Sequence, residues 1–309
     1  MSDAKNAEQT FHTPTPVLPS FDYVRPATPQ EVTRLLSKSN GDARLYMGGT
    51  DVFVRMRDGF MAPKILIDVK HLPGMREVKF TKRNGLTVGA AVDMNSLARH
   101  PAVTEHYVVL AEALHTVASY QLRTRATMGG NLCNASPAAD TAPAALVLEA
   151  MMVLHGRRGE YQIPITEFFV GPGKTAVKPG SFLVRIGIPP APKGAVGRYV
   201  KLGRNALGDL AIVGVAVLGY PDRRAKSGYS FRIALASVAP TPIRVPNAEA
   251  ILAESPITPD MIEAVANAAM ETARPIDDVR SSAAYRKAMV KNLTKRAVTE
   301  VWEKLVQAD

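Results

Sequence analysis

Cysteine is almost absent from this sequence, with one residue of this type among 309. A single thiol excludes a disulfide framework, a cysteine-rich zinc site and an iron–sulfur cluster held by this chain alone, because each of these needs several sulfur ligands. The six histidines show no spacing typical of a metal site. We therefore expect no metal ligands in this chain, and its cysteine usage fits a reducing compartment.

Long apolar runs and aromatic residues are also scarce. No run approaches the roughly 18 apolar residues that a membrane span needs, and the polar N-terminus lacks the apolar centre of a signal peptide, so we expect a cytoplasmic protein. Aromatic residues make up 6% of the chain, and despite a net charge of +10 they form no stripe with basic residues. Nucleic-acid binding is therefore not expected. A basic face for an acidic partner subunit or an anionic cofactor explains the charge equally well.

The composition is otherwise typical of a globular protein, with 46% hydrophobic and 21% charged residues. The length suits two or three domains. Residues 1–19 are polar and contain prolines, so we expect a flexible tail there. The Pro/Gly-rich stretch 189–197 marks the best domain boundary. We therefore predict one domain over residues 20–188 and a C-terminal domain over residues 198–309.

Hydrophobic periodicity and turn residues predict an α+β fold with mixed sheets. Thr28-Pro29-Gln30-Glu31 has the pattern of a helix start, with Thr28 as the cap and Glu31 reaching back. Helices are expected to begin at 28 and to cover 103–119, 140–150, 247–254, 258–273 and 281–306. Strands are expected at 44–47, 64–70, 77–80, 86–92, 198–203, 209–220 and 229–238, with further short strands within 151–170 and 181–188.

A glycine pair follows the first expected strand of this series, in Met47-Gly48-Gly49-Thr50-Asp51. Two glycines permit positive φ angles and leave the backbone bare. Successive N–H groups can then converge on phosphate oxygens, and Thr50 adds a hydroxyl donor. Taken alone, the glycine pair fits an ordinary tight turn better than a phosphate site.

A second glycine pair lies in the small-residue segment 127–140, TMGGNLCNASPAAD. We expect this segment to be a loop that offers many small hydrogen-bond donors. Asp140 can accept paired hydrogen bonds from ribose hydroxyls, or it can cap the helix that follows. Cys133 lies among small residues and is expected to contribute to packing rather than to act as a nucleophile.

Together, the segments YMGGTDVFVRM and RTRATMGGNLCNASPAADTAPAALVLEA resemble the flavin subunit of molybdenum hydroxylases. This is the family of xanthine dehydrogenase and of the carbon monoxide dehydrogenase medium subunit. The resemblance covers about residues 20–300. It implies an α+β protein with an FAD-binding domain of two subdomains, split near residue 60, and a smaller C-terminal domain. Some medium subunits carry a cysteine-rich insertion for a 4Fe–4S cluster, which this chain cannot hold with Cys133 alone.

The resemblance also implies which residues bind FAD. Asp140 resembles the acid that binds the adenosine ribose, and Val117 falls near the adenine side. Leu183 is similar to a residue that packs on the flavin ring. Lys201 is similar to a lysine at the pyrimidine edge of the ring, where a cation stabilises the reduced flavin. The loops around the diphosphate correspond to Tyr46, Met47, Gly48, Gly49, Thr50, Asp51, Val52 and Phe53 in the first, and to Thr127, Gly130 and Asn131, with Ser136 beside them, in the second.

The resemblance further implies a heterotrimer, because this chain has no molybdopterin or 2Fe–2S region. A large molybdopterin subunit hydroxylates the substrate, and a small subunit passes electrons through 2Fe–2S centres. The FAD of this chain delivers them to NAD, oxygen or a quinone, and no side chain here is expected to be catalytic. Two alternatives are a stand-alone FAD-dependent reductase or oxidase and a basic scaffold that has lost its cofactor. The intact glycine segments argue against the second alternative.

Overall fold

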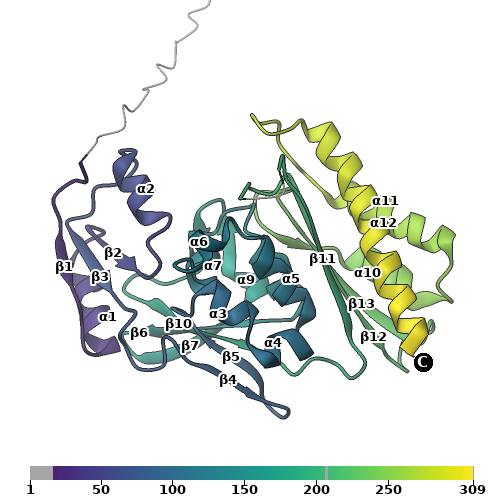
Figure 1. Cartoon of the computed structure of the whole chain (residues 1–309), viewed down its shortest axis with the longest axis horizontal. Coiled ribbons are helices and arrows are strands. Elements are labelled where there is room, and N and C mark those ends of the chain that lie inside the picture. The colour runs from purple at the N-terminus through teal and green to yellow at the C-terminus, as the bar shows by residue number, and fades with distance from the viewer. Residues whose placement is uncertain (1–16, 206–207, 309) are drawn as a thin grey trace, which may run out of the picture.

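The computed structural model describes residues 17–205 and 208–308, so most of the tail predicted over 1–19 lies outside the described residues. Figure 1 shows three parts in a row, each built around one main sheet. A small N-terminal part lies at one end, a central part carries a larger sheet with covering helices, and the C-terminal part lies at the other end. None of the described helices is long and apolar enough to cross a membrane.

The N-terminal part is a parallel three-stranded sheet with two helices. Thr28 caps the first helix as predicted, since its Oγ1 accepts a hydrogen bond from the Glu31 N–H at 3.3 Å. The subdomain split near residue 60 stays a prediction, and the strand that completes this sheet lies a few residues beyond that position. The elements are, in sheet order, β1 (Asp22–Val24), β3 (Ile65–Asp68) and β2 (Ala43–Tyr46), with α1 (Pro29–Lys38) and α2 (Val52–Arg57).

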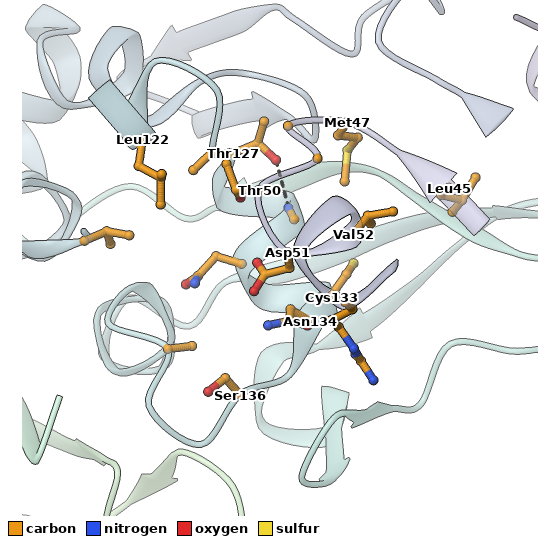
Figure 2. A pocket seen from close by; sticks show the side chains of 18 of the residues that line it. Leu45, Met47, Thr50, Asp51, Val52, Leu122, Thr127, Cys133, Asn134 and Ser136 are labelled. Carbon is orange, nitrogen blue, oxygen red and sulfur yellow. Dashed lines mark hydrogen bonds between the residues drawn. The ribbon is translucent and has the colours of Figure 1, made fainter. Parts of the chain in front are cut away.

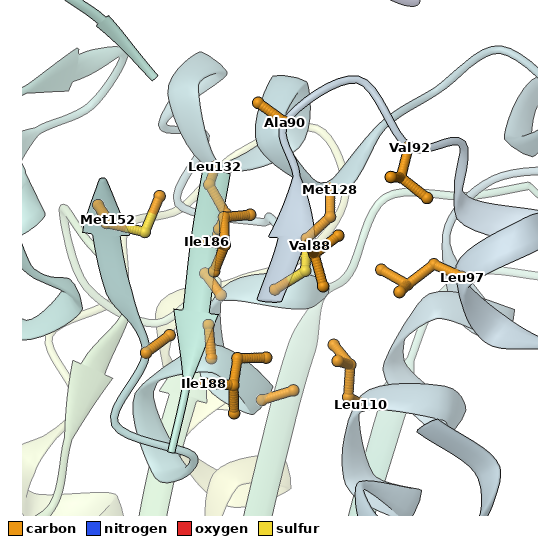
Figure 3. Packing of buried hydrophobic residues seen from close by; sticks show 14 of the residues in the cluster. Val88, Ala90, Val92, Leu97, Leu110, Met128, Leu132, Met152, Ile186 and Ile188 are labelled. Carbon is orange, nitrogen blue, oxygen red and sulfur yellow. The ribbon is translucent and has the colours of Figure 1, made fainter. Parts of the chain in front are cut away.

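The central part is an antiparallel five-stranded sheet covered by short helices. Figure 3 shows the buried side chains that hold it together, with Val88 and Ile186 from adjacent strands packing near Met128 and Leu110 from two helices. The strands pair in the order β4 (Val78–Thr81), β5 (Gly85–Gly89), β10 (Phe182–Ile188), β6 (Met151–Gly156) and β7 (Gly159–Pro164).

The helices of the central part are short because the chain must turn repeatedly around the sheet. A two-stranded hairpin follows the last of them. These elements are α3 (Met94–Ala98), α4 (Pro101–His106), α5 (Val108–Thr116), α6 (Tyr120–Arg123), α7 (Met128–Asn134), α8 (Thr141–Val147), α9 (Ile165–Phe168), β8 (Phe169–Gly171) and β9 (Lys174–Thr175).

The C-terminal part packs three helices against an antiparallel four-stranded sheet, while α5 and α8 of the central part also contact its strands (Figure 1). Gly219 faces the last helix, where a Cβ atom would lie 2.9 Å from Val301 and Leu305. The bare backbone there lets the helix approach the sheet closely. The elements are β11 (Val196–Leu202), β12 (Val213–Pro221), β13 (Tyr229–Ala236), β14 (Ile243–Arg244), α10 (Pro246–Glu254), α11 (Pro259–Thr272) and α12 (Ala283–Ala308).

The structure corrects two expectations about the elements. The helix predicted over 103–119 is broken at Tyr107, whose φ of −133° and ψ of 50° are not helical. The Tyr107 hydroxyl donates to the Pro189 carbonyl at 3.0 Å, so a tertiary contact outweighs local helix periodicity there. The sheets are not mixed: each one in the described residues is wholly parallel or wholly antiparallel.

Candidate functional site

A cavity of about 600 Å³ lies where the three parts of the molecule meet. Figure 2 shows Thr50 and Asp51 from the loop after β2 gathered around the same space as Thr127 and Asn134 from the second glycine segment. Thirteen of the predicted site residues line the cavity: Met47, Gly48, Gly49, Thr50, Asp51, Val52, Val117, Thr127, Gly130, Asn131, Ser136, Asp140 and Leu183.

The loop between β2 and α2 supplies backbone donors to this cavity. Gly49 adopts a φ of +76°, and a Cβ atom there would lie 2.5 Å from the Tyr46 ring and 3.0 Å from the Phe53 ring. Within the described chain, the N–H groups of Gly49, Thr50 and Asp51 donate no hydrogen bond. N–H groups without an acceptor beside a cavity are the arrangement that binds phosphate oxygens.

Tyr46 and Phe53 do not line the cavity, although both were predicted to be part of the diphosphate loop. Tyr46 is buried behind the loop, where its hydroxyl accepts a hydrogen bond from Arg125 Nη2 at 3.0 Å. The Lys70 Nζ atom lies 3.6 Å from the centre of the Tyr46 ring and 2.7 Å from an Asp68 carboxylate oxygen. Burial lowers the pKa of Lys70 despite this ion pair. The two aromatic rings therefore support the loop rather than face a ligand.

The second glycine pair lies in helix α7, not in the loop that was predicted. Thr127 caps this helix, and its Oγ1 accepts a hydrogen bond from the Gly130 N–H at 2.9 Å (Figure 2). Gly129 packs against backbone, since a Cβ atom there would lie 2.5 Å from the Ala90 carbonyl oxygen. Capping and close packing thus favour the helix over the glycine propensity for a loop. The Gly130 N–H is engaged by the cap instead of being free for phosphate.

Asp140 lies in the cavity wall within a buried polar cluster. Its Oδ1 accepts a hydrogen bond from the Tyr199 hydroxyl at 2.8 Å, and its Oδ2 accepts one from Lys201 Nζ at 2.8 Å. Burial raises the pKa of Asp140, although Lys201 and Tyr199 oppose this shift, and it raises the pKa of Tyr199 well above its usual range. Asp140 makes no side-chain hydrogen bond to α8, so the helix-cap alternative is wrong.

The structure brings together residues that the resemblance assigns to opposite ends of FAD. Asp140 and Val117 were predicted on the adenosine side, and Lys201 at the flavin ring. Lys201 contacts Asp140 directly and also donates to the carbonyl of Thr116, the residue before Val117. The diphosphate of an extended dinucleotide separates its two ends, so these predictions place both ends of FAD beside one contact. Lys201 does not line the cavity itself, but it contacts Asp140, which does.

Several lining residues were not among the predicted FAD-binding residues. Cys133 lines the cavity and is partly exposed, and desolvation raises the pKa of its thiol to about 12. A neutral thiol fits packing better than nucleophilic chemistry. In residues 17–205 and 208–308, no group of three side chains could hold a metal ion. The other unpredicted lining residues include Arg44, Arg55, Met61, Leu122, Phe182, Gly208, Asp209 and Leu210.

Comparisons with known proteins agree on one family. A family profile described as "FAD binding domain in molybdopterin dehydrogenase" matches residues 19–191, and one described as "CO dehydrogenase flavoprotein C-terminal domain" matches residues 198–301. The chain is 32% identical to the carbon monoxide dehydrogenase medium chain of Hydrogenophaga pseudoflava, covering 92% of this chain and 98% of that one.

Two further comparisons extend this result. The chain is 30% identical to a putative xanthine dehydrogenase FAD-binding subunit of Escherichia coli, covering 90% of this chain and 94% of that one. The solved structure of carbon monoxide dehydrogenase from Hydrogenophaga pseudoflava, which lacks the Mo-pyranopterin moiety, matches with a TM-score of 0.88 and 32% identity. That match covers 93% of this chain and 99% of the other. The order of the three parts is therefore shared with proteins of this family.

The Asp140–Lys201 pair predicts a strong energetic coupling between the C-terminal and central parts. Their side chains are only 7% and 10% exposed. Asp140→Asn leaves a buried ammonium group without its counter-charge, and Lys201→Met leaves a buried carboxylate, so each should lower the free energy of unfolding by about 3–5 kcal/mol. The double variant should lose less than the two single losses combined. Urea unfolding of the flavin-free chain measures the free energy of unfolding of all three variants. A loss in the double variant that equals the sum of the two single losses to within about 0.5 kcal/mol would contradict the coupling.

Proposed function

The chain belongs to the family of FAD-binding medium subunits of molybdenum hydroxylases, and we propose that it carries electrons from the 2Fe–2S centres of a small partner subunit to an external acceptor. As a medium subunit it is the FAD-binding component of an oxidoreductase. The proposed assembly is a heterotrimer that also contains a large molybdopterin subunit, and the acceptor is NAD, oxygen or a quinone. The observation that supports this proposal is a large cavity with unused backbone donors at the place where the three parts meet.

The residues around the cavity fit FAD. The N–H groups of Gly49, Thr50 and Asp51 would hold the diphosphate, and the bare backbone of Gly49 lets phosphate oxygens come within about 3 Å. Met47 and Val52 supply apolar walls on the same loop. When bound, FAD supplies transfer of electrons singly or in pairs, which suits a junction between one-electron centres and a two-electron acceptor.

We further propose that the flavin ring lies at the end of the cavity where Asp140 and Lys201 meet. Asp140 lines the cavity, and its raised pKa is set by burial, so the carboxyl group is a poorly solvated partner for a ring N–H. Lys201 places a positive charge directly behind it. Under this proposal, Lys201 keeps its predicted role at the ring, and Asp140 and Val117 move from the adenosine side to the ring side.

Gly49→Ala should weaken FAD binding strongly without unfolding the chain. A Cβ atom there would lie 2.5 Å from the Tyr46 ring, so the loop must shift and its N–H groups lose their alignment. We expect flavin occupancy to fall at least about tenfold, which corresponds to a loss of 1.4 kcal/mol or more in binding. Gly74→Ala is the matched control, since Gly74 has a φ of +78° and nothing within 4 Å of its Cβ position. Flavin absorbance and circular dichroism measure both; equal flavin content in the two variants would contradict the prediction.

The Gly49→Ala variant also tests the proposed electron path. The complex should be purified through a tag on this chain, and its subunits, FAD, iron and molybdenum quantified. After chemical reduction of its iron–sulfur centres, we expect NAD, oxygen or a quinone to reoxidise the wild-type complex. Without flavin, that reoxidation should slow at least about tenfold, because the remaining centres lack a two-electron exit. Unchanged reoxidation would refute the path. Full turnover by this chain alone would favour the stand-alone reductase or oxidase.

The position of the flavin ring is tested by removing a buried cation. Lys201→Met should lower the two-electron reduction potential of bound FAD by about 30 mV or more, equivalent to about 1.4 kcal/mol, because a nearby positive charge stabilises the reduced flavin. Lys70→Met is the matched control, since Lys70 is 11% exposed and paired with Asp68 at 2.7 Å, much as Lys201 is 10% exposed and paired with Asp140 at 2.8 Å. If only Lys70→Met lowered the reduction potential of bound FAD, the flavin ring would lie at the end of the cavity near Lys70 instead.

A further inference from the structure

A second concave site lies on the far side of α1 from the cofactor cavity. It has a volume of about 350 Å³ and is formed by one face of α1 and by the turn between β6 and β7. Phe182 separates it from the cofactor cavity, because this side chain lines that cavity while its ring centre lies 6.0 Å from that of His155 in the second site. The two sites therefore share a wall but no lining residue.

Positive charge is concentrated in this second site. Arg34 and Lys38 enter it from α1 and Arg157 from the β6–β7 turn. Within the described chain, none of these three side chains forms an ion pair or a hydrogen bond. The acidic residue of the turn region, Glu160, is held by Arg185 through two hydrogen bonds of 2.6 and 2.5 Å. The three cations thus face a concave surface without local neutralisation, which raises the local concentration of anions.

A largely buried histidine also lines the same place. His155 is 7% exposed and lines the site. Its Nδ1 lies 3.2 Å from the Thr33 Oγ1, whereas its Nε2 has no hydrogen-bond partner in residues 17–205 and 208–308. This nitrogen is not among the fully enclosed side-chain atoms that lack a partner, so it is accessible from outside the protein. His155 therefore provides a fixed, unused hydrogen-bonding atom next to three unpaired cations.

We propose that this pocket binds a phosphate ester of about mononucleotide size. Arginine side chains bind phosphate oxygens through paired, charge-assisted hydrogen bonds, and two of the three cations here are arginines. The volume of about 350 Å³ corresponds to roughly ten water molecules and exceeds what inorganic phosphate fills. The phosphate lies among Arg34, Lys38 and Arg157, and the remainder of the ligand occupies the space beside His155. This site is additional to the flavin function and does not depend on it.

Calorimetric titration of the FAD-loaded complex tests this proposal, since the bound FAD blocks its own cavity. The probes are adenosine monophosphate, adenosine and inorganic phosphate at low ionic strength. We expect adenosine monophosphate to bind more tightly than phosphate, and adenosine not to bind. The double variant Arg34→Ala with Arg157→Ala should weaken binding of adenosine monophosphate by at least about tenfold. Arg158→Ala is the matched control, because Arg158 lies next to Arg157 in the turn and is exposed but does not line the site. The affinity of this variant for adenosine monophosphate should stay within about twofold of wild type.

Three results would each overturn the proposal. The first is an equal loss of affinity in the Arg158 variant and the double variant, which would indicate non-specific attraction to the basic surface. The second is equal binding of adenosine and adenosine monophosphate, which would show that no phosphate is recognised. The third is absence of adenosine monophosphate binding in the wild-type complex while an acidic peptide binds, which would identify the surface as a protein contact. Circular dichroism of each variant confirms that lost binding is not lost folding.

Discussion

The cofactor cavity depends on a contact between two backbones. Gly48 lies so close to the residue Arg125 that a Cβ atom would sit 2.2 Å from its carbonyl oxygen, nearer than any real Cβ contact. Residues 48 and 125 belong to the N-terminal and central parts, so this contact joins the two parts directly beside the cavity. The hydrogen bond from Arg125 to Tyr46 and the Lys70 ammonium over the Tyr46 ring hold the same junction from behind. The loop is therefore positioned by contacts that involve no cofactor atom, which is the preorganisation that binding a charged diphosphate requires.

The opposite wall of the cavity is fixed through strand β11. Successive residues of a strand point to opposite faces. Tyr199 and Lys201 are two positions apart, so both reach Asp140 from the same face of the strand. The residue just before Tyr199, Arg198, bridges Glu112 of α5 at 2.6 Å and Glu300 of α12 at 2.5 Å. One strand thus ties the cavity wall to both the central part and the last helix.

Features that depend on residues close together in the chain could be predicted from the sequence. The cap at Thr28, the β-branched strand that became β3, and the glycine loop beside the cavity all follow from residues near each other in the chain. Pairing partners do not: β3, which lies beyond the predicted split near residue 60, completes the first sheet. Helix α7 was missed because glycine disfavours helices by about 1 kcal/mol. The Thr127 cap was a local signal for this helix, whereas the packing of Gly129 on Ala90 is a tertiary contact. The contact between Asp140 and Lys201 joins residues 61 positions apart, so no spacing rule could reveal it.

Two polar clusters beside the cavity use the same three residue types with opposite results. Asp68 is approached by the Tyr23 hydroxyl and the Lys70 ammonium, as Asp140 is by Tyr199 and Lys201. Burial favours the neutral acid in both, but the pKa of Asp68 lies below its usual range and that of Asp140 above it. One cause of the difference is that Asp68 also accepts a hydrogen bond from the backbone N–H of Lys70 at 3.0 Å, which lowers its pKa, whereas no backbone N–H contributes to the pKa of Asp140. In the first cluster, the lowered pKa of Asp68 thus favours a charged carboxylate, which pairs with Lys70 behind the loop. The second is a carboxyl group that lines the cavity and whose pKa is raised by burial, and under the proposed function this group faces the flavin ring.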